Sequence, residues 1–112
     1  MAFQRGDVVL VPFPFSDLST TKVRPAIIVS STLYHNTEPD LVLAAITSNV
    51  LSASRPLDYV LQDWQAAGLR YASAFKPVFF TLDPRQVLFK IGTLNVPDLS
   101  EVDRRIRLAL QL

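Results

Sequence analysis

The chain has 112 residues, 49% of them apolar, which is enough for one hydrophobic core but not for two, so we expect a single domain over residues 1–112. A formal net charge of +1 excludes the strongly basic balance of a dedicated duplex-binding domain. The lack of cysteine excludes disulfides and thiolate metal sites, and the lack of a leader-like start or a long apolar run predicts a cytoplasmic protein without membrane contact.

Six short runs rich in Val, Ile, Leu and Phe follow one another, separated by many of the eight prolines and three glycines. This pattern is typical of a mainly β (α+β) protein, a small barrel. We predict strands at residues 7–12, 25–30, 41–47, 58–61, 73–82 and 87–93. The fifth strand should be bent or interrupted at Pro77, because proline cannot donate a hydrogen bond to a central ladder.

Two segments have helical patterns. Residues 62–70, QDWQAAGLR, fit one or two helical turns closed by Gly68. Residues 95–112 fit an amphipathic helix in which Asn95 caps the first turn, acids lie early and arginines lie late. We interpret these arginines as a solvent-exposed helix face, since the acids of the same helix balance their charge.

The stretch KVRPAIIVSS, residues 22–31, places Arg24 directly before Pro25 and an apolar run. The residue before a proline is pushed toward extended backbone, so Arg24 should be held in a fixed direction at the mouth of a strand. Two roles fit this position. Arg24 pairs with Asp7 or Asp17 at the barrel rim, or it binds an anionic ligand.

The stretch AAITSN, residues 44–49, ends a buried strand in two hydroxyls and an amide. Small polar donors at a strand end suit the oxygens of a phosphate. The alternative is an ordinary turn, in which such side chains bond their own backbone.

The loop PFPFSDLSTTK, residues 12–22, places two phenylalanines, Phe13 and Phe15, among prolines ahead of a polar tail. An exposed aromatic there could stack on an unpaired base. It could equally plug the core ahead of a hairpin loop.

The remaining catalytic residue types are few. The single histidine, His35, excludes a two-histidine acid–base pair, and its surroundings, YHNTEPD, indicate a surface loop. Without cysteine and with scattered carboxylates, we expect no metal centre and no cofactor.

The order of GDVVLVPFPFSD, KVRPAIIVSS, LVLAAITSN, AGL, FTLD and KIGTL before a terminal helix resembles the MazF/PemK/Kid family of toxins from toxin–antitoxin modules, over residues 6–110. The resemblance implies an SH3-like barrel, shared with the gyrase poison CcdB. It implies metal-free cleavage of single-stranded RNA at a short sequence, in which the 2′-hydroxyl attacks the adjacent phosphate and leaves a cyclic phosphate and a 5′-hydroxyl. It also implies a two-fold homodimer that binds RNA or the tail of a cognate antitoxin in a groove across the pair.

By the matching motifs, Arg24 and Thr47 fall on catalytic positions of that family. A guanidinium stays protonated, so Arg24 should stabilise charge on the phosphorane-like transition state, while Thr47 holds a non-bridging oxygen. The expected substrate-binding residues are Ser48, Asn49, Lys76, Phe15 and Lys22.

The segment FKPVFFTLD departs from the family pattern. Some members of the family carry an Arg and, two residues later, an Asp, which serve as acid and base. This chain has Lys76 and Val78 at those positions. It also has Phe80 where another arginine is common in the family. Three classes therefore stay open: a sequence-specific endoribonuclease, a catalytically weak or silent relative that binds RNA or a protein partner, and a gyrase-directed or other protein-binding toxin on the same fold. The arginine with two hydroxyls favours the first class, and the missing acid favours the second.

Overall fold

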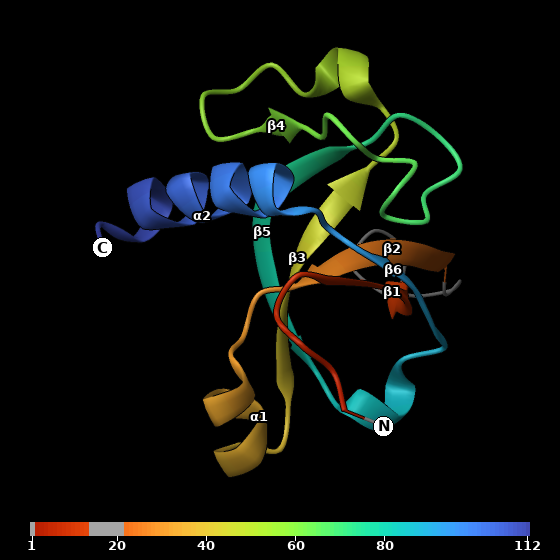
Figure 1. Ribbon diagram of the computed structural model, residues 1–112, viewed down its shortest axis with the longest axis vertical. Coiled ribbons are helices and arrows are strands. Elements are labelled where there is room, and N and C mark those ends of the chain that lie inside the picture. Colours follow the sequence, from red (N-terminus) through yellow and green to blue (C-terminus); the bar gives the residue numbers. More distant parts are fainter. Residues whose placement is uncertain (1, 14–21) are drawn as a thin grey trace.

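The computed structural model describes residues 2–13 and 22–112. Its elements, in chain order, are β1 (Asp7–Phe13), β2 (Lys22–Ile28), α1 (Thr32–Thr37), β3 (Leu41–Thr47), η1 (Val50–Ser52), β4 (Tyr59–Val60), β5 (Ala74–Leu82), η2 (Pro84–Gln86), β6 (Phe89–Thr93) and α2 (Val96–Leu110), where η marks a short 3-10 turn. Figure 1 shows α1 at one end of the sheet and η1 at the opposite end.

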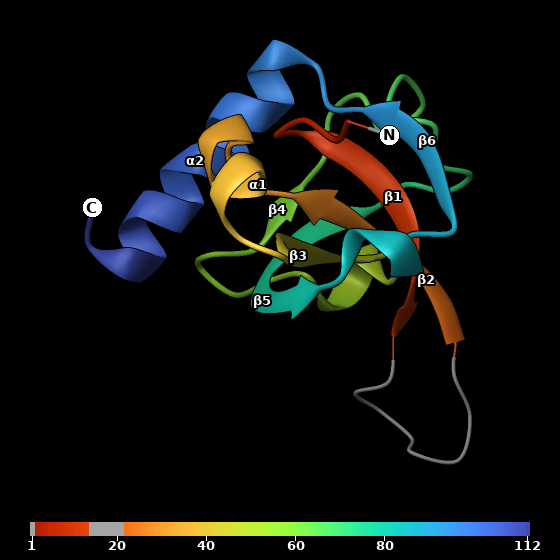
Figure 2. The same cartoon turned by 90° about the horizontal axis from the view of Figure 1, so that it is seen from below.

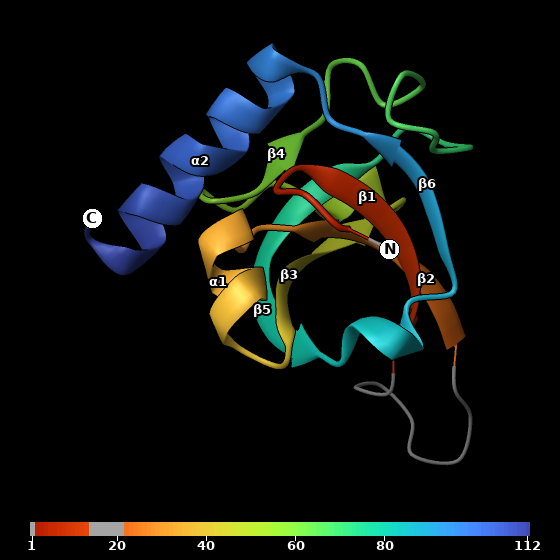
Figure 3. The same cartoon turned by 60° about the horizontal axis from the view of Figure 1, so that its bottom comes forward.

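The strands form one curved sheet in the order β4-β5-β3-β2-β1-β6, and every pair is antiparallel. α2 contacts β4 and β5, and its last turns extend beyond the sheet (Figures 2 and 3). The prediction of a mainly β, barrel-like fold with a C-terminal helix is confirmed. None of the helices in the described ranges is long and apolar enough to cross a membrane.

Alternation along the strands gives the sheet two faces, each with its own core. The face that α2 covers, called the helix face, buries residues that include Val8, Ile27, Ile46, Phe75 and Val102. The other face, called the second face, buries Val9, Val11, Ala26, Ile28, Leu41, Leu43 and Phe80. Because successive side chains of a strand point to opposite faces, a residue two positions from one of these core residues belongs to the same face.

β2 differs from its predicted bounds of 25–30. It begins at Lys22, because the β1 ladder continues to the pair formed by Phe13 and Lys22. Arg24 consequently lies inside the strand, opposite Val11, rather than just before it. On the other side, pairing with β3 begins only at Ala26.

The predicted interruption of the fifth strand at Pro77 is confirmed. The ladder between β3 and β5 shifts register between Ala44, which pairs with Phe79, and Ile46, which pairs with Phe75. Pro77 lies in the unpaired stretch, where its missing N–H costs no ladder hydrogen bond.

The surface loop expected around His35 is wrong, because Thr32–Thr37 form the helix α1. Ser31 caps the helix, since its Oγ accepts from Tyr34 N–H at 3.1 Å. The His35 ring is half-buried and lies 2.6 Å from Ser30 Oγ through Nε2 and 3.1 Å from the Phe3 carbonyl oxygen through Nδ1. The histidine thus ties the N-terminal segment to the sheet.

The segment 62–70 forms turns rather than a regular helix, but its predicted end is correct. Leu69 N–H donates to Trp64 O at 3.2 Å and Gly68 N–H donates to Gln65 O at 3.0 Å, with Gly68 at φ +83°. This pair of hydrogen bonds is the Schellman pattern that glycine closes.

The cap of α2 is also as predicted, since Asn95 Oδ1 accepts from Asp98 N–H at 3.0 Å. Asp98 itself is not a surface acid but is fully buried. Arg105 likewise does not lie on a solvated face, because its guanidinium stacks on the Tyr59 ring at 4.4 Å and bonds Glu101 at 2.6 Å.

Candidate functional site

Arg24 and Thr47 lie on neighbouring strands, β2 and β3. β2 and β3 pair Ala26 with Ala45, Ile27 with Ala44 and Ile28 with Leu43. Arg24 and Thr47 each lie two residues beyond the last pair, where the ladder between β2 and β3 has ended. Both residues alternate with the second-face core, so both belong to the second face.

The expected alternative of a rim ion pair between Arg24 and Asp7 is wrong. Asp7 is buried and is bound by Thr93 Oγ1 at 3.1 Å and Lys90 Nζ at 3.3 Å. Arg24 is exposed and makes no ion pair with any residue that the structure describes. Asp17, the other expected partner, lies outside the described residues. The guanidinium is therefore not held by Asp7.

A cavity of about 450 Å³ opens beside Arg24. Arg24 and Ser48 both line it, whereas Thr47 does not. The wall is largely apolar, with polar groups at several points, a composition typical of ligand pockets. Its lining residues are Leu10, Val23, Arg24, Pro25, Ile46, Ser48, Gly68, Leu69, Arg70, Tyr71, Ser73 and Ile91.

Arg70 and Tyr71 are lining residues that the sequence analysis missed. Both are exposed, and 67% of Tyr71 is accessible to solvent. They follow Gly68, whose backbone crosses β6 so closely that a Cβ atom would lie 1.9 Å from the Ile91 carbonyl oxygen. The AGL and KIGTL motifs thus fix the loop that brings a second arginine and an aromatic ring to the cavity.

The residues at the end of β3 form, in part, the ordinary turn that was the alternative to a phosphate site. Thr47 Oγ1 accepts from Asn49 N–H at 3.1 Å, a local side-chain-to-backbone bond. Ser48 and Asn49 are exposed, and only Ser48 lines the cavity. The Thr47 hydroxyl hydrogen can still be donated to a ligand, since the bond to Asn49 uses only a lone pair.

The other expected binding residues are dispersed. Lys22 is exposed at the start of β2, two residues from Arg24 on the same face. Lys76 does not line the cavity but forms an ion pair of 2.8 Å with the buried Asp58. Phe15 lies outside the described residues.

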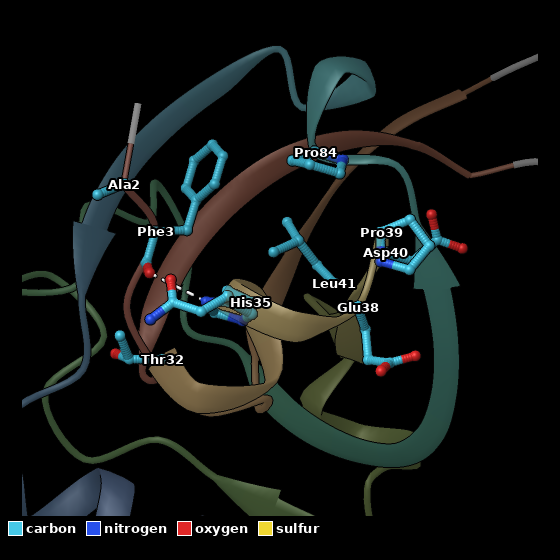
Figure 4. Close-up of a pocket in the computed structure, with 10 residues that line it drawn as sticks. Ala2, Phe3, Thr32, His35, Glu38, Pro39, Asp40, Leu41 and Pro84 are labelled. Atoms are coloured by element: carbon cyan, nitrogen blue, oxygen red, sulfur yellow. Dashed lines mark hydrogen bonds between the residues drawn. The ribbon is translucent and has the colours of Figure 1, made fainter.

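A second cavity, of about 440 Å³, lies beside α1 (Figure 4). Its lining includes the carboxylates of Glu38 and Asp40 together with His35, and no lysine or arginine. A polyanion would be repelled there, so the cavity beside Arg24 is the better candidate for a phosphate ligand. In the part of the chain that the structure describes, no group of three or more His, Asp or Glu residues is arranged to hold a metal ion.

The sequence matches the profile of a known protein family. The profile of the family described as "PemK-like, MazF-like toxin of type II toxin-antitoxin system" matches residues 4–110. No curated protein matches the chain significantly.

Solved structures share the fold at low sequence identity. An endoribonuclease in complex with its cognate antitoxin, from a mycobacterial species, is 17% identical with a TM-score of 0.77, and the match covers 99% of this chain and 95% of that one. MazF in a MazE–MazF crystal structure from Deinococcus radiodurans is 18% identical with a TM-score of 0.78, covering 100% and 99%. The Mycobacterium tuberculosis toxin MazF-mt6 is 16% identical with a TM-score of 0.75, covering 95% and 97%.

Proposed function

Since the chain belongs to the family of PemK-like, MazF-like toxins of type II toxin–antitoxin systems, we propose that it is a sequence-specific, metal-independent endoribonuclease that cleaves single-stranded RNA. The observation that carries the proposal is that Arg24 and Thr47 belong to the second face of neighbouring strands, each two residues beyond the last β2–β3 pair. Arg24 also lines, with Arg70 and Ser48, a cavity whose strand residues Pro25 and Ile46 alternate with the helix-face core. The family resemblance seen in the sequence is confirmed by the same match.

The proposed reaction needs no resident cofactor. The 2′-hydroxyl oxygen bonds to the adjacent phosphorus while the bond from phosphorus to the 5′-oxygen breaks. The 2′-hydroxyl loses its proton to water and the leaving 5′-oxygen gains one from water, which leaves a cyclic phosphate and a 5′-hydroxyl. Negative charge builds on the non-bridging oxygens between these events, and this charge is what the site must stabilise.

Arg24 suits that task because its planar guanidinium can bind two phosphoryl oxygens at once. The Thr47 hydroxyl would donate to one of the same oxygens, and Ser48 would contact the substrate beside it. Asn49, Lys22 and Phe15 remain proposed substrate contacts.

The cavity beside Arg24 would hold a base next to the scissile phosphate. Its apolar wall accepts a base face, and the exposed Tyr71 ring offers a stacking surface at the rim. Arg70 adds a second cation to this cavity.

We also propose a cytoplasmic homodimer regulated by a cognate antitoxin. Two of the similar structures are of toxins bound to antitoxins. Large apolar side chains are exposed at the end of α2, where Leu108 and Leu110 are more than half accessible, and such surface suits a protein interface.

A catalytically weak or silent RNA-binding relative is the second candidate, favoured by the exposed Val78 at the position where some family members carry an acid. One experiment separates the two. Purified protein is incubated with mixed-sequence RNA in excess chelator, and the fragment ends are identified. Fragments with cyclic phosphate and 5′-hydroxyl ends at a recurring short sequence support the proposal, whereas RNA that is bound but intact supports the second candidate.

A further inference from the structure

Lys76 and Asp58 form a cross-strand pair. β4 and β5 pair Tyr59 with Phe75, so the register puts Asp58 directly opposite Lys76, and the Lys76 Nζ atom lies 2.8 Å from Asp58 Oδ2. The Asp58 side chain is 1% exposed, whereas that of Lys76 is 24% exposed. The carboxylate is therefore buried beneath the ammonium, and only the lysine can reach a ligand.

This pair belongs to the same face of the sheet as the candidate catalytic residues. Ala74 pairs with Thr47, and Lys76, two residues farther along β5, lies on the same side as Ala74. Phe80, an even number of residues from Ala74 and Lys76 along β5, belongs to the second-face core. β5, β3 and β2 are consecutive in the sheet, and Lys76 lies two residues along β5 from Ala74, the residue level with Thr47, so the backbones of Lys76 and Arg24 stand at least about 12 Å apart. Both side chains are long, and a phosphate between them would lie over β3.

The charges of the pair are maintained. Burial alone would raise the pKa of Asp58, but the Lys76 ammonium and the Arg55 N–H, which lies 3.1 Å from Oδ2, hold that pKa below its ordinary value. Asp58 Oδ1 is buried and has no hydrogen-bond partner among the described residues. A buried ion pair with an unsatisfied oxygen is rarely more stable than an apolar pair of the same volume. The pair is therefore only weak evidence of a stabilising role.

Resting on the proposed ribonuclease function, we propose that Asp58 is a positioning residue that holds the Lys76 ammonium over the second face as the second cation on the scissile phosphate. β5 carries Val78 where some family members have an acid two residues after the basic one, and Asp58 supplies a carboxylate to Lys76 from the neighbouring strand instead. Asp58 does not touch the substrate and acts only through Lys76.

The test is a double-mutant cycle on RNA cleavage, with Asp58→Asn, Lys76→Gln and the combined variant. We expect Lys76→Gln to lower kcat about 10²-fold and Asp58→Asn about tenfold, and the combined variant to match Lys76→Gln alone. Lys76→Arg should keep cleavage within about tenfold, because it retains the charge. Affinity for an uncleavable oligonucleotide with 2′-deoxyribose at the scissile position should change much less than kcat in Asp58→Asn.

Two controls keep the test decisive. Lys90→Gln breaks another lysine pair with a buried aspartate, Asp7, at the far edge of the sheet, and should leave kcat within about threefold. If Asp58→Asn unfolds, the apolar pair Asp58→Leu with Lys76→Met preserves volume and should fold, yet cleave as poorly as Lys76→Gln.

The outcomes are distinct. A wild-type protein that neither cleaves nor binds RNA overturns the proposed function, and this inference with it. A wild-type protein that cleaves, together with an Asp58→Asn variant or an apolar double variant that cleaves equally well, overturns the positioning role of Asp58 alone. Additive losses in the cycle would also overturn it, because they would show that Asp58 does not act through Lys76.

Discussion

Gly68 and Gly92 meet backbone to backbone. A Cβ atom on Gly68 would lie 1.9 Å from the Ile91 carbonyl oxygen, and one on Gly92 would lie 2.2 Å from the Ala67 carbonyl oxygen. Backbone atoms cannot move aside as the end of a flexible side chain can. The two glycines thus allow the loop that lines the candidate cavity to lie directly on β6.

We expect Gly92→Ala to destabilise the protein by roughly 2–4 kcal/mol, since the new methyl group can be accommodated only by separating two backbones. Urea unfolding measures the loss. Gly6→Ala is the control. Gly6 has a positive φ, +93°, which Gly92 does not, so an alanine there is strained, but its nearest neighbour is the flexible Leu99 side chain at 3.1 Å. The control should lose only about 1–2 kcal/mol. A Gly92→Ala variant as stable as the wild type would show that the crossing is not tight.

Asp98→Ala should destabilise the fold by roughly 3–5 kcal/mol. The buried carboxylate accepts from Tyr59 OH at 2.6 Å and from the N–H groups of Gln62 and Asp63, each at 2.9 Å, and the variant leaves three donors without a partner. Asp40→Asn, at the surface, should change the free energy of unfolding by less than about 0.5 kcal/mol. Equal urea midpoints for both variants would contradict this account.

Arg24→Lys should lose RNA cleavage almost as completely as Arg24→Ala, by about 10²–10³-fold, because a lysine keeps the charge but not the two-pronged donor geometry. Thermal melting should hardly change, since an exposed arginine contributes at most about 1 kcal/mol. Parallel cleavage and melting measurements decide the matter. Equal cleavage by all three proteins would remove Arg24 from the site, and unfolded variants would make its role structural.

Asp83 should titrate at unusually low pH. Its side-chain hydrogen bond from Arg85, at 2.7 Å, and the Arg85 backbone N–H lower the pKa of Asp83 from 3.8 to about 2. Because the folded-state pKa is depressed, its stabilising contribution is present above the unfolded-state value near 3.8 and is lost as the pH falls toward 2.

Carbon NMR titration of the Asp83 carboxyl measures this pKa in the wild type and in Arg85→Ala. The variant should raise the pKa only part of the way to 3.8, because the backbone N–H remains. Arg104→Ala, which removes an arginine bonded to Glu101 instead, should not move it. An unchanged pKa in Arg85→Ala would contradict the assigned cause.

The regular elements follow from local signals in the sequence. The Asn95 cap and the helical spacing of Val102 and Ile106 predicted α2, and the interruption at Pro77 follows from its missing N–H. α1 was missed because it has only six residues, none of them buried, so no apolar periodicity marks it. Its signal was the Ser31 cap, which is too common in turns to stand alone.

The site was predictable only where a motif carried it. Arg24, Thr47 and Ser48 were proposed from their sequence motifs, and the structure puts Arg24 and Thr47 on neighbouring strands. The pair of Lys76 with Asp58 could not be foreseen, because it depends on the register between β4 and β5. Arg70 and Tyr71 were missed for a similar reason, since a backbone crossing with β6 brings them to the cavity.

The burial of Asp98 makes the C-terminal helix and the 59–63 segment depend on each other. The carboxylate stands in the first turn of α2 but satisfies donors more than thirty residues earlier, so neither the helix nor the 59–63 segment is complete without the other. The C-terminal helix is therefore not a detachable tail, although its last residues are exposed. The amide protons of Gln62 and Asp63 should exchange with solvent only when the whole domain opens, at the rate of global unfolding rather than of helix fraying.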